Sequence, residues 1–186
     1  MIQTFRTGLA RLDTLGDAAL PLLARFAFAA VLALYYWASA LTKVGDGVFG
    51  LFRPSLGAYA QIFPRAMEAA GYDVAQLGLF HWAVVTAGTL AEFVLPALIL
   101  LGLATRLAAL GMIGFVVLQS LTDIVGHAAD PGTIGAWFDR LPDGVILDQR
   151  LLWVFVLVTL VFRGAGPLSL DRLLARRFDP AVSQAM

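Results

Sequence analysis

The chain has 186 residues, of which 60% are hydrophobic and only 14% are charged, with a mean hydropathy of +0.81. A soluble domain carries roughly a quarter charged residues, so this composition excludes a water-soluble globular protein and indicates a membrane protein of one domain. Basic and acidic residues balance at 13 each and cysteine is absent. We therefore expect no nucleic-acid binding and no haem, thiol or iron–sulfur ligation by the chain.

Four segments approach the ~20 apolar residues that a membrane-spanning helix needs. In chain order they cover residues 21–42, 81–103, 106–125 and 145–162. The second and third segments are so close together that only a tight hairpin can join them. Irregular backbone cannot face lipid, so the sequence predicts an all-α fold, an antiparallel bundle of four transmembrane helices.

Short amphipathic helices are predicted before and after the four spans. Residues 1–20 place apolar side chains on one helical face, namely Phe5, Leu9, Leu12 and Leu15. Residues 167–178 contain Ser169 as a helix N-cap and then three arginines, Arg172, Arg176 and Arg177. Both patterns are typical of helices that lie on a membrane surface. Solvated tails are the alternative, notably for the last eight residues.

The two long loops, residues 43–80 and 126–144, are also expected to contain short helices. Proline and glycine bound two segments of suitable length, residues 64–71 and 133–141. Asp73 is a candidate N-cap from which the second long helix would begin.

The distribution of charge predicts the orientation of the bundle in the membrane. The side with both termini and the 102–106 hairpin has seven basic and four acidic residues, a net charge of +3. The other side has five basic and eight acidic residues, a net charge of −3. Since basic loops stay in the cytoplasm, both termini are predicted to be cytoplasmic.

Glu92 is a carboxylate near the middle of the second span. A charged side chain at that depth costs about 2.5–3.5 kcal/mol, so Glu92 should face the bundle interior, either protonated or paired. Arg25 is the candidate ion-pair partner, and Tyr35 and Tyr36 could hydrogen-bond a neutral carboxyl group. Glu92 is either a proton acceptor beside a quinone-like ligand or a structural clamp. For Arg25, the simpler interpretation is that its long side chain extends to the lipid headgroups.

A second polar cluster is predicted at the outer ends of the spans. It comprises Gln119, Ser120, Asp123, His127, Asp148 and Arg150, with Lys43 and His81 at the same level. Asp123 and His127 are spaced i, i+4, which places them on one face of a continuous helix. They could hold a divalent cation, or His127 could exchange protons with a reduced quinone. The alternative is ordinary charged helix ends, including an Asp148–Lys43 pair.

Several motifs resemble the DoxX family of small bacterial membrane proteins. Gly166-Pro-Leu-Ser-Leu-Asp-Arg-Leu-Leu174 is similar to the family's C-terminal signature, and residues 101–109 resemble its second hairpin. Glu92 matches the family's acidic residue in the second span. Arg25 and Lys43 match its basic residues at the two ends of the first span, although their spacing of 18 is longer than usual. The resemblance covers residues 25–174.

The resemblance implies a four-helix bundle in a bacterial inner membrane and a link to redox or stress metabolism. The related DoxD proteins are subunits of a thiosulfate:quinone oxidoreductase. The expected function is therefore a membrane subunit of a quinone-linked redox or stress-response system, with a quinone as the first candidate cofactor and a metal ion as the second. A protein partner or self-association is expected in addition to the lipid bilayer.

Two other functional classes are open. The chain could be a non-catalytic membrane anchor or a partner in handling a metal-binding or exported product. A small-solute transporter is less favoured, because the sequence has no evident inverted repeat or pair of broken helices. No motif for autonomous catalysis is present, so the chain is at most one subunit of an oxidoreductase complex.

Overall fold

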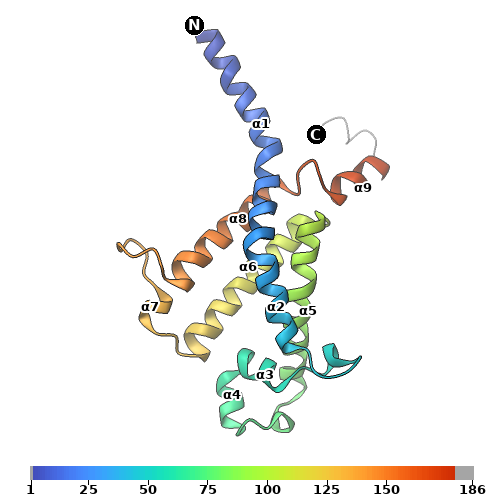
Figure 1. Ribbon diagram of the computed structural model, residues 1–186, viewed down its shortest axis with the longest axis vertical. Coiled ribbons are helices and arrows are strands. Elements are labelled where there is room, and N and C mark those ends of the chain that lie inside the picture. Colours follow the sequence, from blue (N-terminus) through green and yellow to red (C-terminus); the bar gives the residue numbers. More distant parts are fainter. Residues whose placement is uncertain (1, 179–186) are drawn as a thin grey trace.

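The computed structural model describes residues 2–178, with side chains described for Arg6 and from Leu9 to Arg177. Over this range the chain forms helices and loops without any strand (Figure 1). Four helical segments are long and apolar enough to cross a membrane: Leu9–Lys43, Leu79–Leu101, Thr105–Gly126 and Val145–Arg163. The predicted all-α fold with four spanning helices is confirmed. The last eight residues, for which solvated tails were considered, lie outside the described part.

The first span is part of one continuous helical segment that begins well before residue 21, the predicted start of the span. This segment consists of α1 (Ile2–Phe28), a π-helical turn (Ala29–Ala33) and α2 (Leu34–Lys43). The separate interfacial helix predicted over residues 1–20 is instead the first part of α1, which projects beyond the other helices (Figure 1). Pro21 removes only one donor N–H, and the alanine- and leucine-rich sequence around it favours the helix strongly enough to continue.

The second and third spans form the predicted hairpin. α5 (Leu79–Leu101) ends at Gly102, whose φ of 66° is left-handed and suits glycine, and α6 (Thr105–Leu121) follows after two residues. The Gly102 and Leu103 amides donate to the Ile99 and Leu98 carbonyls, which caps the end of α5. A π-helical turn, Thr122–Gly126, extends α6.

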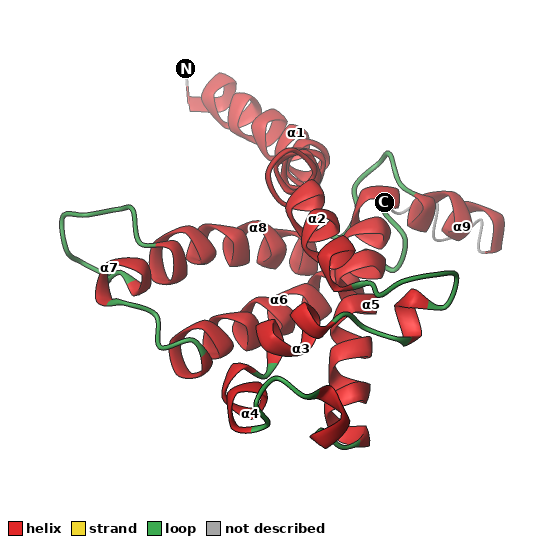
Figure 2. Ribbon diagram, turned by 60° about the horizontal axis from the view of Figure 1, so that its bottom comes forward, coloured by secondary structure: helices red, strands yellow, loops and turns green. Residues whose placement is uncertain are grey.

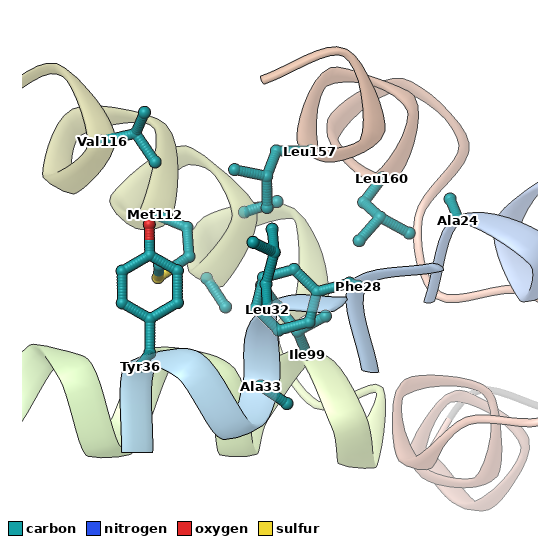
Figure 3. Close-up of a cluster of buried hydrophobic side chains, with 12 residues drawn as sticks. Ala24, Phe28, Leu32, Ala33, Tyr36, Ile99, Met112, Val116, Leu157 and Leu160 are labelled. Atoms are coloured by element: carbon teal, nitrogen blue, oxygen red, sulfur yellow. The ribbon is translucent and has the colours of Figure 1, made fainter. Parts of the chain in front are cut away.

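The fourth span pairs with the third. A π-helical turn (Val145–Gln149) leads into α8 (Arg150–Arg163), and α8 runs beside α6 (Figure 2). α1 packs on α8 and α2 packs on α5, so the first span fills the space between the hairpin and the fourth span. Figure 3 shows the resulting core, whose fully buried members include Phe28, Tyr36, Ile99, Met112 and Leu157.

The loop after the first span is a small helical layer at the bundle end opposite the N-terminus (Figure 1). It contains a 3₁₀ turn (Gly50–Phe52), α3 (Leu56–Ile62), α4 (Pro64–Ala69) and a second 3₁₀ turn (Val74–Gln76). The short helix predicted over residues 64–71 is confirmed by α4. Asp73 caps the second 3₁₀ turn, and α5 begins only at Leu79. The prediction that Asp73 is the N-cap of the second long helix was therefore wrong.

The other long loop contains much less helix than predicted. α7 covers only Pro131–Ile134, with Asp130 as its N-cap, and the helix expected over 133–141 is absent from that segment. The reason lies at Gly135, where a φ of 76° turns the chain out of the helical conformation after one turn.

The predicted C-terminal helix is present as α9 (Leu170–Phe178). The Ser169 hydroxyl accepts a hydrogen bond from the Arg172 amide at 3.2 Å, as expected for an N-cap. α9 lies at the bundle end that carries the α5–α6 hairpin and is therefore far from α3 and α4 (Figure 1).

Candidate functional site

Glu92 is buried in α5 and pairs with Lys43, the last residue of α2. Lys43 Nζ lies 3.0 Å from Glu92 Oε2 and 3.1 Å from Oε1, and each side chain is only 5% exposed. The sequence suggested Arg25 as the partner because Arg25 is the charged residue inside another predicted span, whereas Lys43 was placed just beyond the end of the first span. α2 ends halfway along α5, since the helical layer of α3 and α4 covers the first half of α5. Lys43 therefore sits at the level of Glu92.

Ser39 completes this buried cluster. Lys43 Nζ donates to Ser39 Oγ at 2.6 Å, and the Ser39 hydroxyl donates to Glu92 Oε1 at 3.1 Å. Among the described residues, the Lys43 ammonium is the contact of Glu92 Oε2, whereas Oε1 is contacted by both Lys43 and Ser39. A buried ion pair of this kind is costly to break, because removal of one partner leaves the other charge without compensation. We refer to Ser39, Lys43 and Glu92 as the buried triad.

Tyr35 and Tyr36 contact α6 rather than Glu92. The Gln119 side-chain amide donates to the Tyr35 hydroxyl at 2.8 Å, and the Tyr36 hydroxyl donates weakly to Gln119 Oε1 at 3.4 Å. In Figure 3 the Tyr36 hydroxyl points toward α6, beside Met112. Hydrogen bonding of these tyrosines to the carboxyl group of Glu92 is therefore not seen.

Aromatic rings surround this contact. The Tyr36 ring centroid lies 5.0 Å from that of Tyr35, 5.7 Å from that of Phe115 and 6.5 Å from that of Trp153, with each pair edge to face. Tyr36, Ser39 and Lys43 follow one another at i, i+3 and i+7 on one face of the same helix. The aromatic cluster therefore adjoins the buried triad.

Arg150, at the start of α8, organises the second polar cluster. Its guanidinium lies 2.5 Å from Asp123 Oδ2 and donates to the Ser120 hydroxyl at 3.0 Å, while its residue is only 5% exposed. The guanidinium carbon also lies 5.9 Å from the centroid of the Trp153 ring. Arg150, Asp123 and Gln119 were predicted for this cluster, and the structure brings them to adjacent turns of α6 and α8.

His127 and Asp148 do not join Arg150 and Asp123 in one ligand set. His127 Nε2 is 2.9 Å from the Gln61 carbonyl, and Asp148 Oδ2 accepts from the Gly144 amide at 2.9 Å. The π-helical turn at Thr122–Gly126 changes the register, so the i, i+4 rule for one helical face fails between Asp123 and His127. Residues 2–178 contain no group of three histidine or carboxylate side chains placed to hold a metal ion.

His81 is held apart from both clusters by aromatic packing in the layer that contains α3 and α4. Its ring centroid is 4.8 Å from that of Phe63 and 5.7 Å from that of Phe80. It therefore packs as an aromatic side chain beside the loop helices.

Arg25 is a clamp at the opposite end of the bundle. Its guanidinium donates to four backbone carbonyls, those of Ile99 at 3.0 Å, Leu100 at 2.5 Å, Ala165 at 3.1 Å and Leu168 at 2.5 Å. Two of these carbonyls belong to the end of α5 and two to the connection between α8 and α9. Arg25 thus neither pairs with Glu92 nor extends freely to the headgroups.

These features define a polytopic helical membrane protein with buried ion pairs between its spans. The family model of DoxX matches residues 20–122, more than half of the chain. The protein therefore belongs to the DoxX family, as the sequence motifs predicted, and the matched region includes all three members of the buried triad. No curated protein and no solved structure gave a significant match.

Proposed function

We propose that the protein is a membrane subunit of a quinone-linked redox or stress-response system, in which the buried triad exchanges protons with the ligand. The observation that carries this proposal is the Lys43–Glu92 pair inside helices that are otherwise apolar. Ionisable residues are expensive at such positions, and where they occur they tend to mark proton or ligand pathways.

The surroundings of the triad suit a flat, redox-active ring. Quinone sites combine an apolar slot with one or two hydrogen-bonding partners. The aromatic cluster of Tyr35, Tyr36, Phe115 and Trp153 provides flat apolar surfaces, and the Gln119 amide provides a hydrogen-bonding group beside them. A quinone bound there would supply the two-electron chemistry that no side chain of this chain can supply.

The triad itself supplies a route for a proton. Glu92 Oε2 contacts only the Lys43 ammonium among the described residues, so a ligand hydroxyl group would take its place beside this ion pair. The Lys43 ammonium stabilises the carboxylate form of Glu92, and Ser39 hydrogen-bonds to both side chains. Glu92 is thus the proposed proton acceptor, and Lys43 and Ser39 position its carboxyl group.

Glu92→Gln is expected to reduce the quinone that co-purifies with the protein in mild detergent by about tenfold. A charged hydrogen bond contributes roughly 1.5–3 kcal/mol, and 1.4 kcal/mol corresponds to a factor of ten in affinity. The quinone content per mole of protein would be measured by solvent extraction and chromatography. Glu68→Gln, which alters an exposed carboxylate in α4, is the matched control and should retain the wild-type content.

The absence of quinone from the wild-type protein, or equal contents in the Glu92 and Glu68 variants, would overturn this proposal. The same preparations would be analysed for metals, with His127→Ala as a further variant. A stoichiometric metal that disappears in His127→Ala would instead support a metal-handling role.

A second candidate function is a non-catalytic membrane anchor for a partner protein. It is favoured by the fact that Lys43 and Arg150 both already have acidic partners inside the bundle. Leu12 and Leu15 on the projecting part of α1 are exposed and could contact a partner or a second copy of the chain. Finding a stoichiometric polypeptide but no quinone in the purified material would favour this candidate.

We also infer an inner-membrane location with cytoplasmic termini, from the charge difference between the two sides. Single cysteines at Val48 and Arg177 test this orientation, because the chain has no native cysteine and both positions are exposed. A membrane-impermeant maleimide applied to intact spheroplasts should label Val48→Cys and spare Arg177→Cys. Both should react once the membrane is permeabilised. Labelling of Arg177→Cys alone in intact spheroplasts would reverse the orientation.

A further inference from the structure

A cavity of about 890 Å³ lies at the end of the bundle that carries α9. Its walls come from four places: α1 near Asp17, the start of α6, the end of α8 and one face of α9. We call it the α9 cavity. It is separate from the buried triad, which lies beside the last residue of α2, toward the other end of the first span.

Hydrogen bonds hold α9 against the α5–α6 hairpin and so fix the shape of this cavity. The Asp171 carboxylate accepts from the Ala104 amide at 2.7 Å and the Thr105 amide at 3.0 Å, which caps the start of α6. The Asp171 amide donates to the Gly102 carbonyl at 2.8 Å. The cavity wall formed by α9 is therefore anchored at three points.

The charge in the α9 cavity is positive. Four arginines and two aspartates line it: Arg106, Arg163, Arg172 and Arg176 with Asp17 and Asp171. Asp17 is paired with Arg163, and Asp171 is engaged by backbone amides. Four positive against two negative charges leave a net charge of +2.

Three of the arginines have no acidic partner in the described part of the chain. Arg106 donates to the Val161 carbonyl at 3.2 Å, while Arg172 and Arg176 form no ion pair within residues 9–178. Arg172 and Arg176 are therefore lining residues whose charge no acidic side chain of the described residues neutralises.

The rim of the cavity is apolar where it meets the lipid-facing surface of the bundle. Leu107 and Phe162 both line the cavity and are 72% and 73% exposed. A cationic wall beside exposed apolar side chains suits an amphiphile with an anionic head better than a small free anion. The cavity also lies where α5 and α8 end and α6 begins, which is the level expected for the lipid headgroups.

We infer that the α9 cavity binds the headgroup of an anionic phospholipid, with the phosphate held by Arg172 and Arg176. Arginine forms paired hydrogen bonds to phosphate oxygens, and basic pockets between spanning helices are suited to anionic headgroups. The acyl chains would lie along Leu107 and Phe162. This inference is independent of the proposed quinone site.

The test is lipid binding by the full-length protein purified in a neutral detergent. Phosphatidylglycerol should raise the melting temperature, followed by tryptophan fluorescence, whereas phosphatidylcholine and inorganic phosphate at equal concentration should not. The Arg172→Gln/Arg176→Gln variant should need about ten times more phosphatidylglycerol for the same shift, the equivalent of losing one charged contact. Its fold should persist, because neither side chain hydrogen-bonds to residues 9–178.

Arg6→Gln/Arg11→Gln is the matched control, since it removes the same charge from α1 at positions that do not line the cavity. The control should respond to phosphatidylglycerol like the wild type. Equal responses of the two double variants would overturn the site, and an equal response to inorganic phosphate would show a free-anion site instead. A wild-type response to phosphatidylcholine as large as that to phosphatidylglycerol would also overturn it.

Discussion

Replacing Lys43 with methionine is expected to lower the free energy of unfolding in detergent by about 3–5 kcal/mol. Methionine fills much of the same volume, but it leaves the buried Glu92 carboxylate without its counter-ion. Unfolding would be followed through tryptophan fluorescence as a denaturing detergent is added. Lys43 is 4% exposed, so solvent cannot replace the lost contact.

The pair can be separated from general packing with a double-mutant cycle. Glu92→Gln keeps a polar side chain to which Ser39 can still hydrogen-bond. In that background, Lys43→Met no longer leaves a buried carboxylate without a counter-ion. We expect the double variant to be more stable than Lys43→Met alone, with a coupling energy of at least about 1 kcal/mol. Additive effects of the two substitutions would show that the pair contributes no specific interaction.

The fold could be predicted because membrane insertion imposes few choices on a chain. Each span needs a long apolar run, and the backbone must hydrogen-bond within itself, so the four helices follow from composition alone. The errors concern the boundaries. Pro21 was taken as a helix start, although α1 passes through it, and residues 135–141 were taken as helical, although Gly135 ends α7.

The sequence identified part of the candidate site, but it missed Ser39 and placed Lys43 with the second polar cluster instead of with Glu92. Glu92, Arg150, Asp123 and Gln119 are polar residues next to or within apolar spans, which is a signal visible in the sequence. Their pairing was not visible, because it depends on how far α2 extends along α5. A partner for Glu92 could have been found only by allowing the loop helices to cover the first half of α5.

The π-helical turns are the second reason why the pairing escaped prediction. One precedes Tyr35 and Tyr36, one contains Asp123, and one contains Asp148 immediately before Arg150. Each turn rotates the residues that follow it relative to an ideal α-helix. Residues at i and i+4 across such a turn therefore no longer share one helical face. Such turns are frequent at functional sites, which agrees with their position around the two polar clusters.

Arg25→Leu is expected to lower the free energy of unfolding by about 3 kcal/mol or more. A hydrogen bond from a charged donor contributes roughly 1.5–3 kcal/mol. Arg25 donates to four backbone carbonyls, one of them exposed. The Ile99 carbonyl keeps the Gly102 amide as a donor, but the Leu100 carbonyl is at the helix end, where no intrahelical donor replaces Arg25. Arg25→Lys keeps the charge but not the planar fork and should recover only part of the stability. Arg11→Leu, on an exposed position of α1, should change stability by less than about 0.5 kcal/mol.

The same denaturation assay, applied to Arg25→Leu in the Glu92→Gln background, distinguishes this clamp from an ion pair. Effects of the Arg25 and Glu92 substitutions should add, because Arg25 contacts the end of α5, about two helical turns beyond Glu92. A coupling energy as large as that between Lys43 and Glu92 would contradict the clamp.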